Sequence, residues 1–274
     1  MWDRLQDFGG SGERIVFAHA NGYPPGSYQQ FIKQLTPQFQ VFGFHQRPLW
    51  SAELPPKRLN WRRLADDLIE TLAATQTGPV WMMGHSMGAT LSTFAAAKQP
   101  GLFKGLILID PVYMSTRRVV RVQLTPLRRQ AKWPMIYKTL NRPNRFADHA
   151  EAFEFYRGKR VFSGFSDQVL LDYVHAGTRT TPEGDLQLAY AREWEAAAYR
   201  STPWVWPRVA RLKLPVLGLR GETSDTLDQA SFRRWQRLQP QAELHTCRGG
   251  HLLPMEYPEA TARYVIDYLQ QQSG

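Results

Sequence analysis

Short apolar runs alternate with helix-like patterns along the first part of the chain. The runs predict buried strands at residues 15–18, 41–44, 80–83 and 106–109. Trp61 to Leu72 follow helical spacing with Asn60 as N-cap, and a second helix is predicted from Met87 to Lys98, before Pro100. Because the strands are apolar throughout, the pattern predicts a parallel sheet with helices on both faces.

The alternation is interrupted once. Residues 112–207 look helical and irregular and are rich in aromatic residues and arginine. The strand and helix patterns return with residues 216–219, a helix over 228–238, a short strand near Leu244 and a last amphipathic helix. The chain is therefore predicted to form one α/β core domain, residues 1–111 and 208–274, with a helical insertion at 112–207.

Composition restricts the class of protein. The chain has 274 residues and a single cysteine, Cys247, so no internal disulfide is expected and a reducing compartment is indicated. Residues 1–7 lack the pattern of a signal peptide, and no run approaches the roughly 20 apolar residues of a membrane span. These features predict a soluble, cytoplasmic protein without a transmembrane segment.

The net charge of +10 is unevenly distributed. Nine basic residues and no acidic ones lie between Pro111 and Ala147: Arg117, Arg118, Arg121, Arg128, Arg129, Lys132, Lys138, Arg142 and Arg145. Such a cluster is typical of a solvated helix face, and an anionic substrate or a membrane-facing patch stays open. No nucleic-acid-binding module accompanies it, so no nucleic-acid partner is expected.

The strongest chemical signal is the segment Gly84-His85-Ser86-Met87-Gly88, which matches G-x-S-x-G. It lies between a predicted strand and a predicted helix, the context in which a sharp turn exposes the serine. The helix N-terminus behind the turn directs free N–H groups at developing negative charge. Ser86 is therefore the candidate nucleophile.

A serine needs a base, and His251 is the best placed of seven histidines. It follows Gly249-Gly250 in a loop between the last predicted strand and the final helix. His85 is expected to point away from the serine, and His19 to support the loop that follows the first core strand. The remaining histidines have no comparable setting: His45, His149, His175 and His245.

An acid must orient the base and stabilise its charged form. Asp225, in the loop that leaves the strand over residues 216–219, is the preferred candidate. Glu222 and Asp228 lie nearby, and Asp110 follows another strand, so all three remain rivals with alternative roles as caps or loop hydrogen-bond partners.

The three candidate residues follow the order Ser, Asp, His along the chain, which is the order in α/β-hydrolases. The sequence resembles the α/β-hydrolase superfamily along nearly its whole length. Residues 19–25 look like the family's His-Gly oxyanion loop, with Ala20 in place of the usual glycine. The resemblance implies an α/β-hydrolase fold, an oxyanion hole formed by the backbone N–H groups of Asn21 and Met87, and a cap domain at 112–207. It implies no metal and no organic cofactor.

The expected activity is that of an esterase-like serine hydrolase acting on a small carboxylic ester, lactone or thioester. Cleavage of C–C or amide bonds, perhydrolysis, a lyase reaction and a binding or receptor protein with this fold are the alternatives. Aromatic residues of the insertion would either line an aromatic or acyl pocket or form its core: Tyr113, Trp133, Tyr137, Phe153, Phe155, Phe162, Phe165, Trp194, Trp204 and Trp206.

Overall fold

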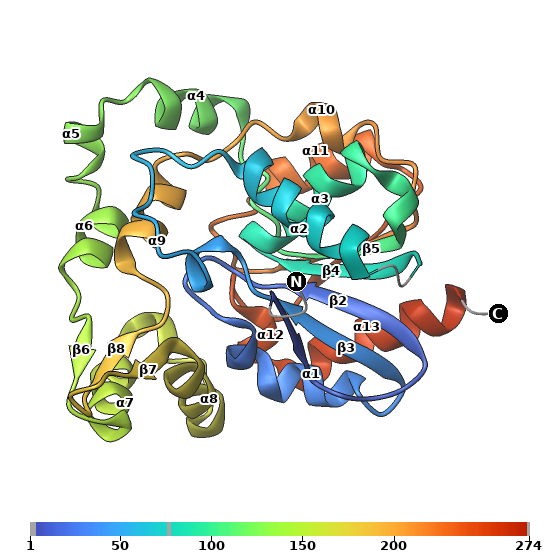
Figure 1. The fold of residues 1–274 in the computed structure, drawn as a ribbon. Coiled ribbons are helices and arrows are strands. Elements are labelled where there is room, and N and C mark those ends of the chain that lie inside the picture. The colour runs from blue at the N-terminus through green and yellow to red at the C-terminus, as the bar shows by residue number, and fades with distance from the viewer. Residues whose placement is uncertain (1–3, 76–77, 273–274) are drawn as a thin grey trace.

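A mostly parallel sheet lies at the centre of the molecule (Figure 1). The computed structural model describes residues 4–75 and 78–272, and within them seven strands follow the order β1-β3-β2-β4-β5-β9-β10. Their bounds are Leu5–Asp7 (β1), Glu13–Ala18 (β2), Phe39–Phe44 (β3), Val80–His85 (β4), Phe103–Ile109 (β5), Val216–Gly221 (β9) and Glu243–Cys247 (β10). The predicted α/β-hydrolase fold with a mostly parallel sheet is confirmed.

The inner strands are those that the apolar runs predicted. Every residue of β4 and β9 is buried, as expected for strands covered on both faces. The edge strand β1 was not predicted, because its three residues, Leu-Gln-Asp, are too few to show a hydrophobic periodicity. It pairs antiparallel with β3, whereas the other neighbouring strands run parallel.

Helices cover both faces of the sheet (Figure 1). On one face α2, Trp61–Thr75, packs against α3, Met87–Lys98; on the other α1, Gln29–Leu35, packs against α13, Pro258–Gln272. The remaining core helices are α10, Trp206–Val209, α11, Gln229–Leu238, and α12, Leu253–Glu256. Asn60 Oδ1 accepts the N–H of Arg62 at 3.1 Å, which confirms its predicted capping role.

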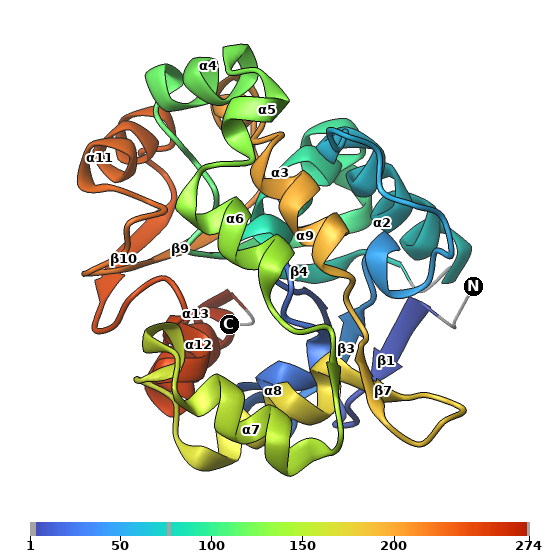
Figure 2. The same cartoon turned by 90° about the vertical axis from the view of Figure 1, so that its left-hand side faces the viewer.

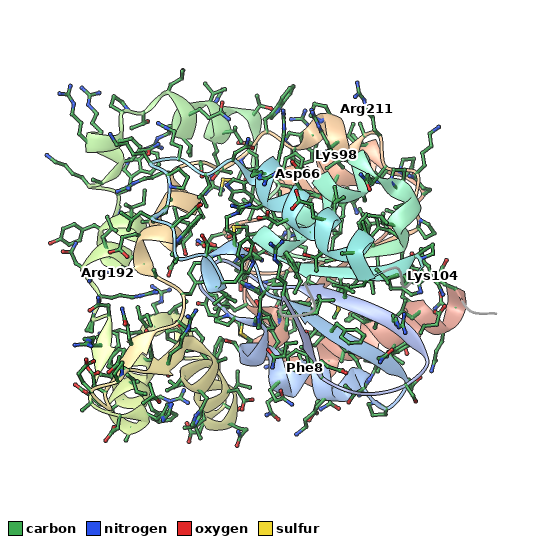
Figure 3. The ribbon with its side chains drawn as sticks, viewed as in Figure 1. Phe8, Asp66, Lys98, Lys104, Arg192 and Arg211 are labelled. Carbon is green, nitrogen blue, oxygen red and sulfur yellow. The ribbon has the colours of Figure 1, made fainter. Side chains whose placement is uncertain are left out.

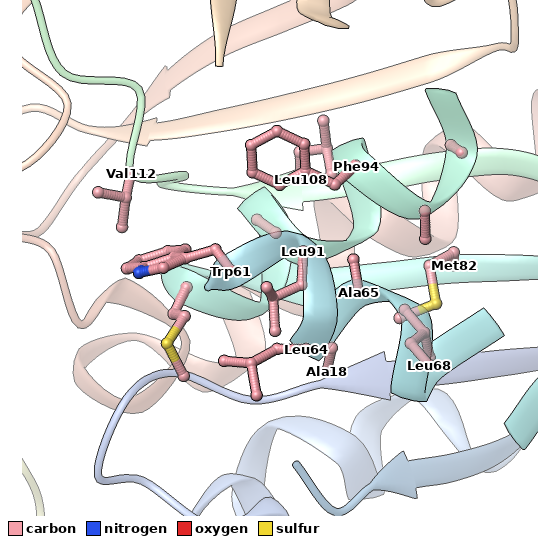
Figure 4. Close-up of a cluster of buried hydrophobic side chains, with 14 of the residues drawn as sticks. Ala18, Trp61, Leu64, Ala65, Leu68, Met82, Leu91, Phe94, Leu108 and Val112 are labelled. Atoms are coloured by element: carbon pink, nitrogen blue, oxygen red, sulfur yellow. The ribbon is translucent and has the colours of Figure 1, made fainter. Parts of the chain in front are cut away.

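The face under α2 and α3 is the larger apolar core. Figure 4 shows Trp61, Leu64 and Leu68 of α2 close to Leu91 and Phe94 of α3, and these side chains are buried. At the C-terminal end of α3, Lys98 Nζ lies 2.6 Å from Asp66 Oδ1 of α2 (Figure 3). The core therefore fixes α3, and with it the residues at the N-terminal end of that helix.

Most of the chain between β5 and α10 forms a separate layer on the left of Figure 1. Its helices are α4, Thr116–Leu124, α5, Leu127–Gln130, α6, Pro134–Asn141, α7, His149–Arg157, α8, Asp167–Gly177, and α9, Arg192–Tyr199. A three-stranded antiparallel sheet accompanies them, formed by β6, Arg145–Phe146, β7, Thr178–Thr180, and β8, Leu186–Leu188. The sequence predicted the helical character of the insertion but not this small sheet.

The insertion's aromatic residues mostly pack inside the protein. The Tyr113 ring contacts two tryptophans, Trp235 of α11 edge to face at a centroid distance of 5.0 Å and Trp206 at 5.7 Å. Phe162 and Phe165 belong to the apolar cluster on the opposite face of the sheet. These four residues are therefore core residues, whereas Trp204 and Tyr137 are exposed.

None of the helices within the described residues combines the length and apolar character that crossing a membrane requires.

Candidate active site

Ser86 lies in a strained turn between β4 and α3. Its backbone has φ 55° and ψ −115°, a region that non-glycine residues rarely adopt. A Cβ on Gly88 would lie 2.0 Å from the carbonyl oxygen of Ala18, and one on Gly84 would lie 2.5 Å from the N atom of Ala89. The two glycines of the motif are thus required by close approach of backbone, which explains their spacing around the serine.

His251 contacts the serine from the loop after β10. Its Nε2 lies 2.8 Å from Ser86 Oγ, within hydrogen-bond reach of a general base. Gly249 allows the loop to turn through a positive φ of 118°, and the N–H of Gly250 donates to Glu256 Oε2 at 2.5 Å. The structure therefore brings together the predicted nucleophile and base.

Asp110 completes the hydrogen-bond chain. Its Oδ2 lies 2.6 Å from His251 Nδ1, and the side chain is fully buried. The N–H of Gly221 donates to Oδ1 at 2.9 Å and the hydroxyl of Ser224 donates to Oδ2 at 2.5 Å. Three donors thus fix a buried carboxylate beside the imidazole, an arrangement that holds one histidine tautomer in place.

The preference for Asp225 is corrected. Asp225 is exposed, and its carboxylate contacts only its neighbour Thr226 Oγ1, at 3.4 Å, among the described residues, while its carbonyl accepts from Arg118 at 3.1 Å. Asp110 follows β5, which lies directly between β4 and β9, so its side chain reaches the imidazole from within the sheet. The loop after β9 contributes Ser224 instead, as a donor to Asp110.

The other two rivals lie outside the hydrogen-bond chain. Asp228 is the N-cap of α11, where its Oδ1 accepts the N–H of Ser231 at 2.8 Å. Glu222 is exposed, and its N–H donates to the carbonyl of Cys247 at 2.8 Å. Both residues therefore have the cap and loop roles that the sequence left open for them.

The predicted oxyanion donors are the backbone N–H groups of Met87, directly after Ser86, and of Asn21, in the loop after β2. Met87 is the first residue of α3, so its N–H has no partner within the helix. Asn21 follows Ala20, whose carbonyl oxygen lies 2.8 Å from His19 Nδ1. Because a trans peptide is planar, holding that carbonyl also directs the Asn21 N–H the opposite way. The two N–H groups stay the predicted donors to a developing oxyanion.

His19 supports this loop as a neutral imidazole. It is fully buried, and burial lowers its pKa to about 3. The N–H of Gln46 donates to His19 Nε2 at 3.3 Å, so Nδ1 carries the ring proton and donates to the Ala20 carbonyl. The predicted supporting role of His19 is confirmed.

This buried histidine predicts acid sensitivity. Below pH 6.5 the unfolded chain binds a proton at His19 that the folded chain does not, so stability is full above that pH and is lost as pH falls toward 3. Between pH 6.5 and 5 the free energy of unfolding should fall by about 2 kcal/mol through His19 alone. Urea titrations at several pH values measure this slope. His19→Gln, which cannot take up the proton, should show a slope smaller by about one proton; equal slopes would contradict the assignment.

The insertion contacts the oxyanion loop directly. Asn21 Nδ2 donates to the carbonyl of Glu195 in α9 at 3.1 Å, and the Tyr190 hydroxyl donates to Asn21 Oδ1 at 2.9 Å. Figure 2, turned to face the insertion, shows α6 and α9 in front of the sheet near β4 and α3. The insertion therefore contacts Asn21, a predicted oxyanion donor.

One arginine of the basic cluster lies beside this contact. Arg142 Nη2 is 2.7 Å from Glu195 Oε2, and the side chains are 17% and 8% exposed. The Glu195 carboxylate in turn lies against Gly22, where an added Cβ would be 2.8 Å from Oε2. The other eight basic residues of the cluster are exposed. Arg142 is thus the member of the cluster that is partly buried and one side chain away from the oxyanion loop.

Within residues 4–75 and 78–272 no group of three or more histidine, cysteine, aspartate or glutamate side chains is arranged to hold a metal ion.

Comparison with known proteins agrees with this architecture. A family model described as "Alpha/beta hydrolase family" matches residues 15–264. The 2-(acetamidomethylene)succinate hydrolase of Mesorhizobium japonicum is 22% identical over 95% of this chain and 89% of its own length.

Solved structures with low sequence identity share the fold. The crystal structure of an E-2-(acetamidomethylene)succinate hydrolase superposes with a TM-score of 0.81 at 20% identity, covering 97% of this chain and 94% of the other. An esterase from Mycobacterium tuberculosis gives a TM-score of 0.74 at 18% identity, covering 97% and 87%.

Proposed function

The chain belongs to the alpha/beta hydrolase family, and from that premise we propose that it cleaves a carboxylic ester, lactone or thioester through an acyl-enzyme intermediate. The observation that carries the proposal is the hydrogen-bond chain from Ser86 through His251 to Asp110, with distances of 2.8 and 2.6 Å. Nucleophile, base and orienting acid are in contact, as the acyl-transfer chemistry of serine hydrolases requires.

In the proposed reaction Ser86 Oγ attacks the carbonyl carbon while His251 Nε2 takes the serine proton. The oxyanion that forms accepts hydrogen bonds from the N–H groups of Asn21 and Met87. Asp110 accepts from His251 Nδ1 and stabilises the imidazolium. His251 then gives its proton to the leaving oxygen or sulfur, and the acyl group stays on Ser86. Water, deprotonated by His251, releases the acid and restores the serine.

We assign substrate selection to residues 112–207 as a cap over this site. The support is the contact of Glu195 and Tyr190 with Asn21, which joins the insertion to a proposed oxyanion donor. The acyl chain beyond the carbonyl carbon of a bound substrate would therefore lie against side chains of α6 and α9.

A second candidate is hydrolysis of an amide that carries a carboxylate. The relative from Mesorhizobium is named for a substrate with an acetamido group and a succinate moiety. In this chain Arg142 Nε is buried and has no hydrogen-bond partner among the described residues. A buried, unpaired guanidinium donor near the oxyanion loop would suit a substrate carboxylate or carbonyl oxygen.

A panel of matched substrates tests both candidates. p-Nitrophenyl esters and p-nitroanilides of a neutral acid and of a succinate half-acid differ in one feature at a time. We expect ester turnover by the wild type; turnover of anilides with equal or higher kcat/KM would favour the amide candidate. Well-folded protein that cleaves neither class would contradict the proposed function.

The double variant Arg142→Gln, Glu195→Gln examines the anion contact without leaving a buried carboxylate unpaired. For the succinate substrates KM should rise about 10-fold or more, the loss of one charge-assisted hydrogen bond, and for neutral substrates it should stay within about twofold. Arg145→Gln is the matched control, because Arg145 is exposed and pairs with Glu183. Equal KM changes for neutral and anionic substrates would argue against the contact.

A further inference from the structure

A chain of buried hydrogen bonds joins three loops of the proposed active site. The N–H of Ala20 donates to Tyr28 Oη at 3.1 Å, Tyr28 Oη lies 2.7 Å from His85 Nδ1, and His85 Nε2 lies 2.7 Å from the carbonyl oxygen of His251. Ala20, Tyr28 and His85 are each no more than 2% exposed. The mechanism proposed above uses neither Tyr28 nor His85.

Burial determines which group donates in each of these hydrogen bonds. It lowers the pKa of His85 well below its ordinary value, and the nearby His251 ring adds to the shift, so the imidazole is neutral. A neutral imidazole has one N–H, and the His251 carbonyl can only accept, so Nε2 carries the proton. The Tyr28 hydroxyl therefore donates to His85 Nδ1 and accepts from Ala20. Burial also raises the pKa of Tyr28, which keeps the phenol protonated.

Each end of the hydrogen-bond chain binds a backbone atom next to a proposed reacting group. Ala20 precedes Asn21, whose N–H is a proposed oxyanion donor. The His251 carbonyl belongs to the residue that supplies the base. His85, in the middle of the hydrogen-bond chain, directly precedes Ser86 in the sequence. Its ring centroid lies 5.2 Å from that of His251. Three groups that must act together are thus tied to one another through two side chains.

We propose that Tyr28 and His85 are positioning residues that set the spacing between the oxyanion loop, the serine turn and the base. The inference rests on the proposed function. The expected cost of removing them is large for groups that contact no substrate, because displacing a reacting group by about 1 Å can lower the rate about 100-fold. The hydrogen bonds reach backbone atoms, so a substitution at Tyr28 or His85 shifts whole loops.

The first test compares Tyr28→Phe with Tyr113→Phe on the ester that the wild type cleaves best. Tyr113 is a matched control, because it is fully buried and its hydroxyl bonds to Thr93 in α3, outside the chain described above. Tyr28→Phe should lower kcat about 10-fold or more while KM stays within about twofold. Tyr113→Phe should lose comparable thermal stability and keep the wild-type kcat.

Substitutions of His85 separate the two halves of the chain. The glutamine amide places its N–H₂ near the Nε2 position, so His85→Gln keeps the donor to the His251 carbonyl, whereas His85→Asn keeps an acceptor for Tyr28. We expect kcat of both to lie above that of His85→Ala, a rescue that a general loss of packing would not produce. These variants also test the positioning role if Tyr28→Phe is insoluble.

Two results would overturn the inference alone: equal kcat for Tyr28→Phe and Tyr113→Phe, or equal kcat for His85→Ala, His85→Gln and His85→Asn while the wild type is active. A wild type that cleaves no ester or amide would instead overturn the proposed function, and the inference with it.

Discussion

Asp110→Asn is expected to lower kcat by about 10⁴-fold with little change in KM. The asparagine amide can present a donor to His251 Nδ1, which favours the wrong imidazole tautomer and removes the charge that stabilises the imidazolium; in serine proteases this change costs about 10⁴-fold. Asp110 Oδ2 lies 2.6 Å from His251 Nδ1, and the Gly221 N–H and Ser224 hydroxyl help to hold it. Steady-state kinetics on the best p-nitrophenyl ester provide the measurement.

Asp225→Asn is the matched control for this prediction. It makes the same chemical change four residues after Gly221, on an exposed side chain. Its kcat should stay within about twofold of the wild type, as is usual for an exposed residue away from the reacting groups. A large loss in Asp225→Asn together with an active Asp110→Asn would restore the acid that the sequence favoured.

Ser86→Ala is expected to have the largest effect, a fall in kcat of about 10⁶-fold to the level left by the oxyanion hole and binding alone. The hydroxyl that lies 2.8 Å from His251 Nε2 is the only atom group removed, so the fold should be unchanged. A fluorophosphonate probe should label the wild type at Ser86 and leave the variant unlabelled, which intact mass measurement detects.

Ser92→Ala controls for the loss of a buried serine hydroxyl, in the helix that follows Ser86. Ser92 is buried in α3, where its hydroxyl donates to the Gly88 carbonyl at 2.8 Å. Its rate and labelling should match the wild type. Unlabelled but well-folded wild-type protein would contradict an activated serine, and labelling of Ser86→Ala would place the nucleophile elsewhere.

The fold could be predicted wherever burial leaves a continuous apolar signature. The runs that became β2, β4 and β5 are unbroken because both sheet faces are covered, and the glycines around Ser86 are required by backbone contact with Ala18 and Ala89. The strands of the small sheet in the insertion are two or three residues long, too short for a period to be seen.

The acid could not be assigned from the sequence for a different reason. Asp110 and Asp225 both follow a predicted strand, and both preserve the order Ser, Asp, His. What separates them is lateral position: β5 is the neighbour of β4, which ends at the serine turn, and β9 lies one strand further. Strand order is a property of the folded sheet, and spacing along the chain does not contain it.

The location of the acid on β5 also affects how this protein can be changed. The backbone N–H of Asp110 bonds to the Leu219 carbonyl at 2.7 Å, and the N–H of Ser86 bonds to the Ile109 carbonyl at 2.9 Å, so the sheet ladder itself holds acid and nucleophile in register. Asp225 lies outside that ladder, exposed in the loop after β9. A library that randomises position 225 can therefore vary this loop while Leu227 stays in the core, Asp228 caps α11, and the ladder holds Asp110 and Ser86 in place.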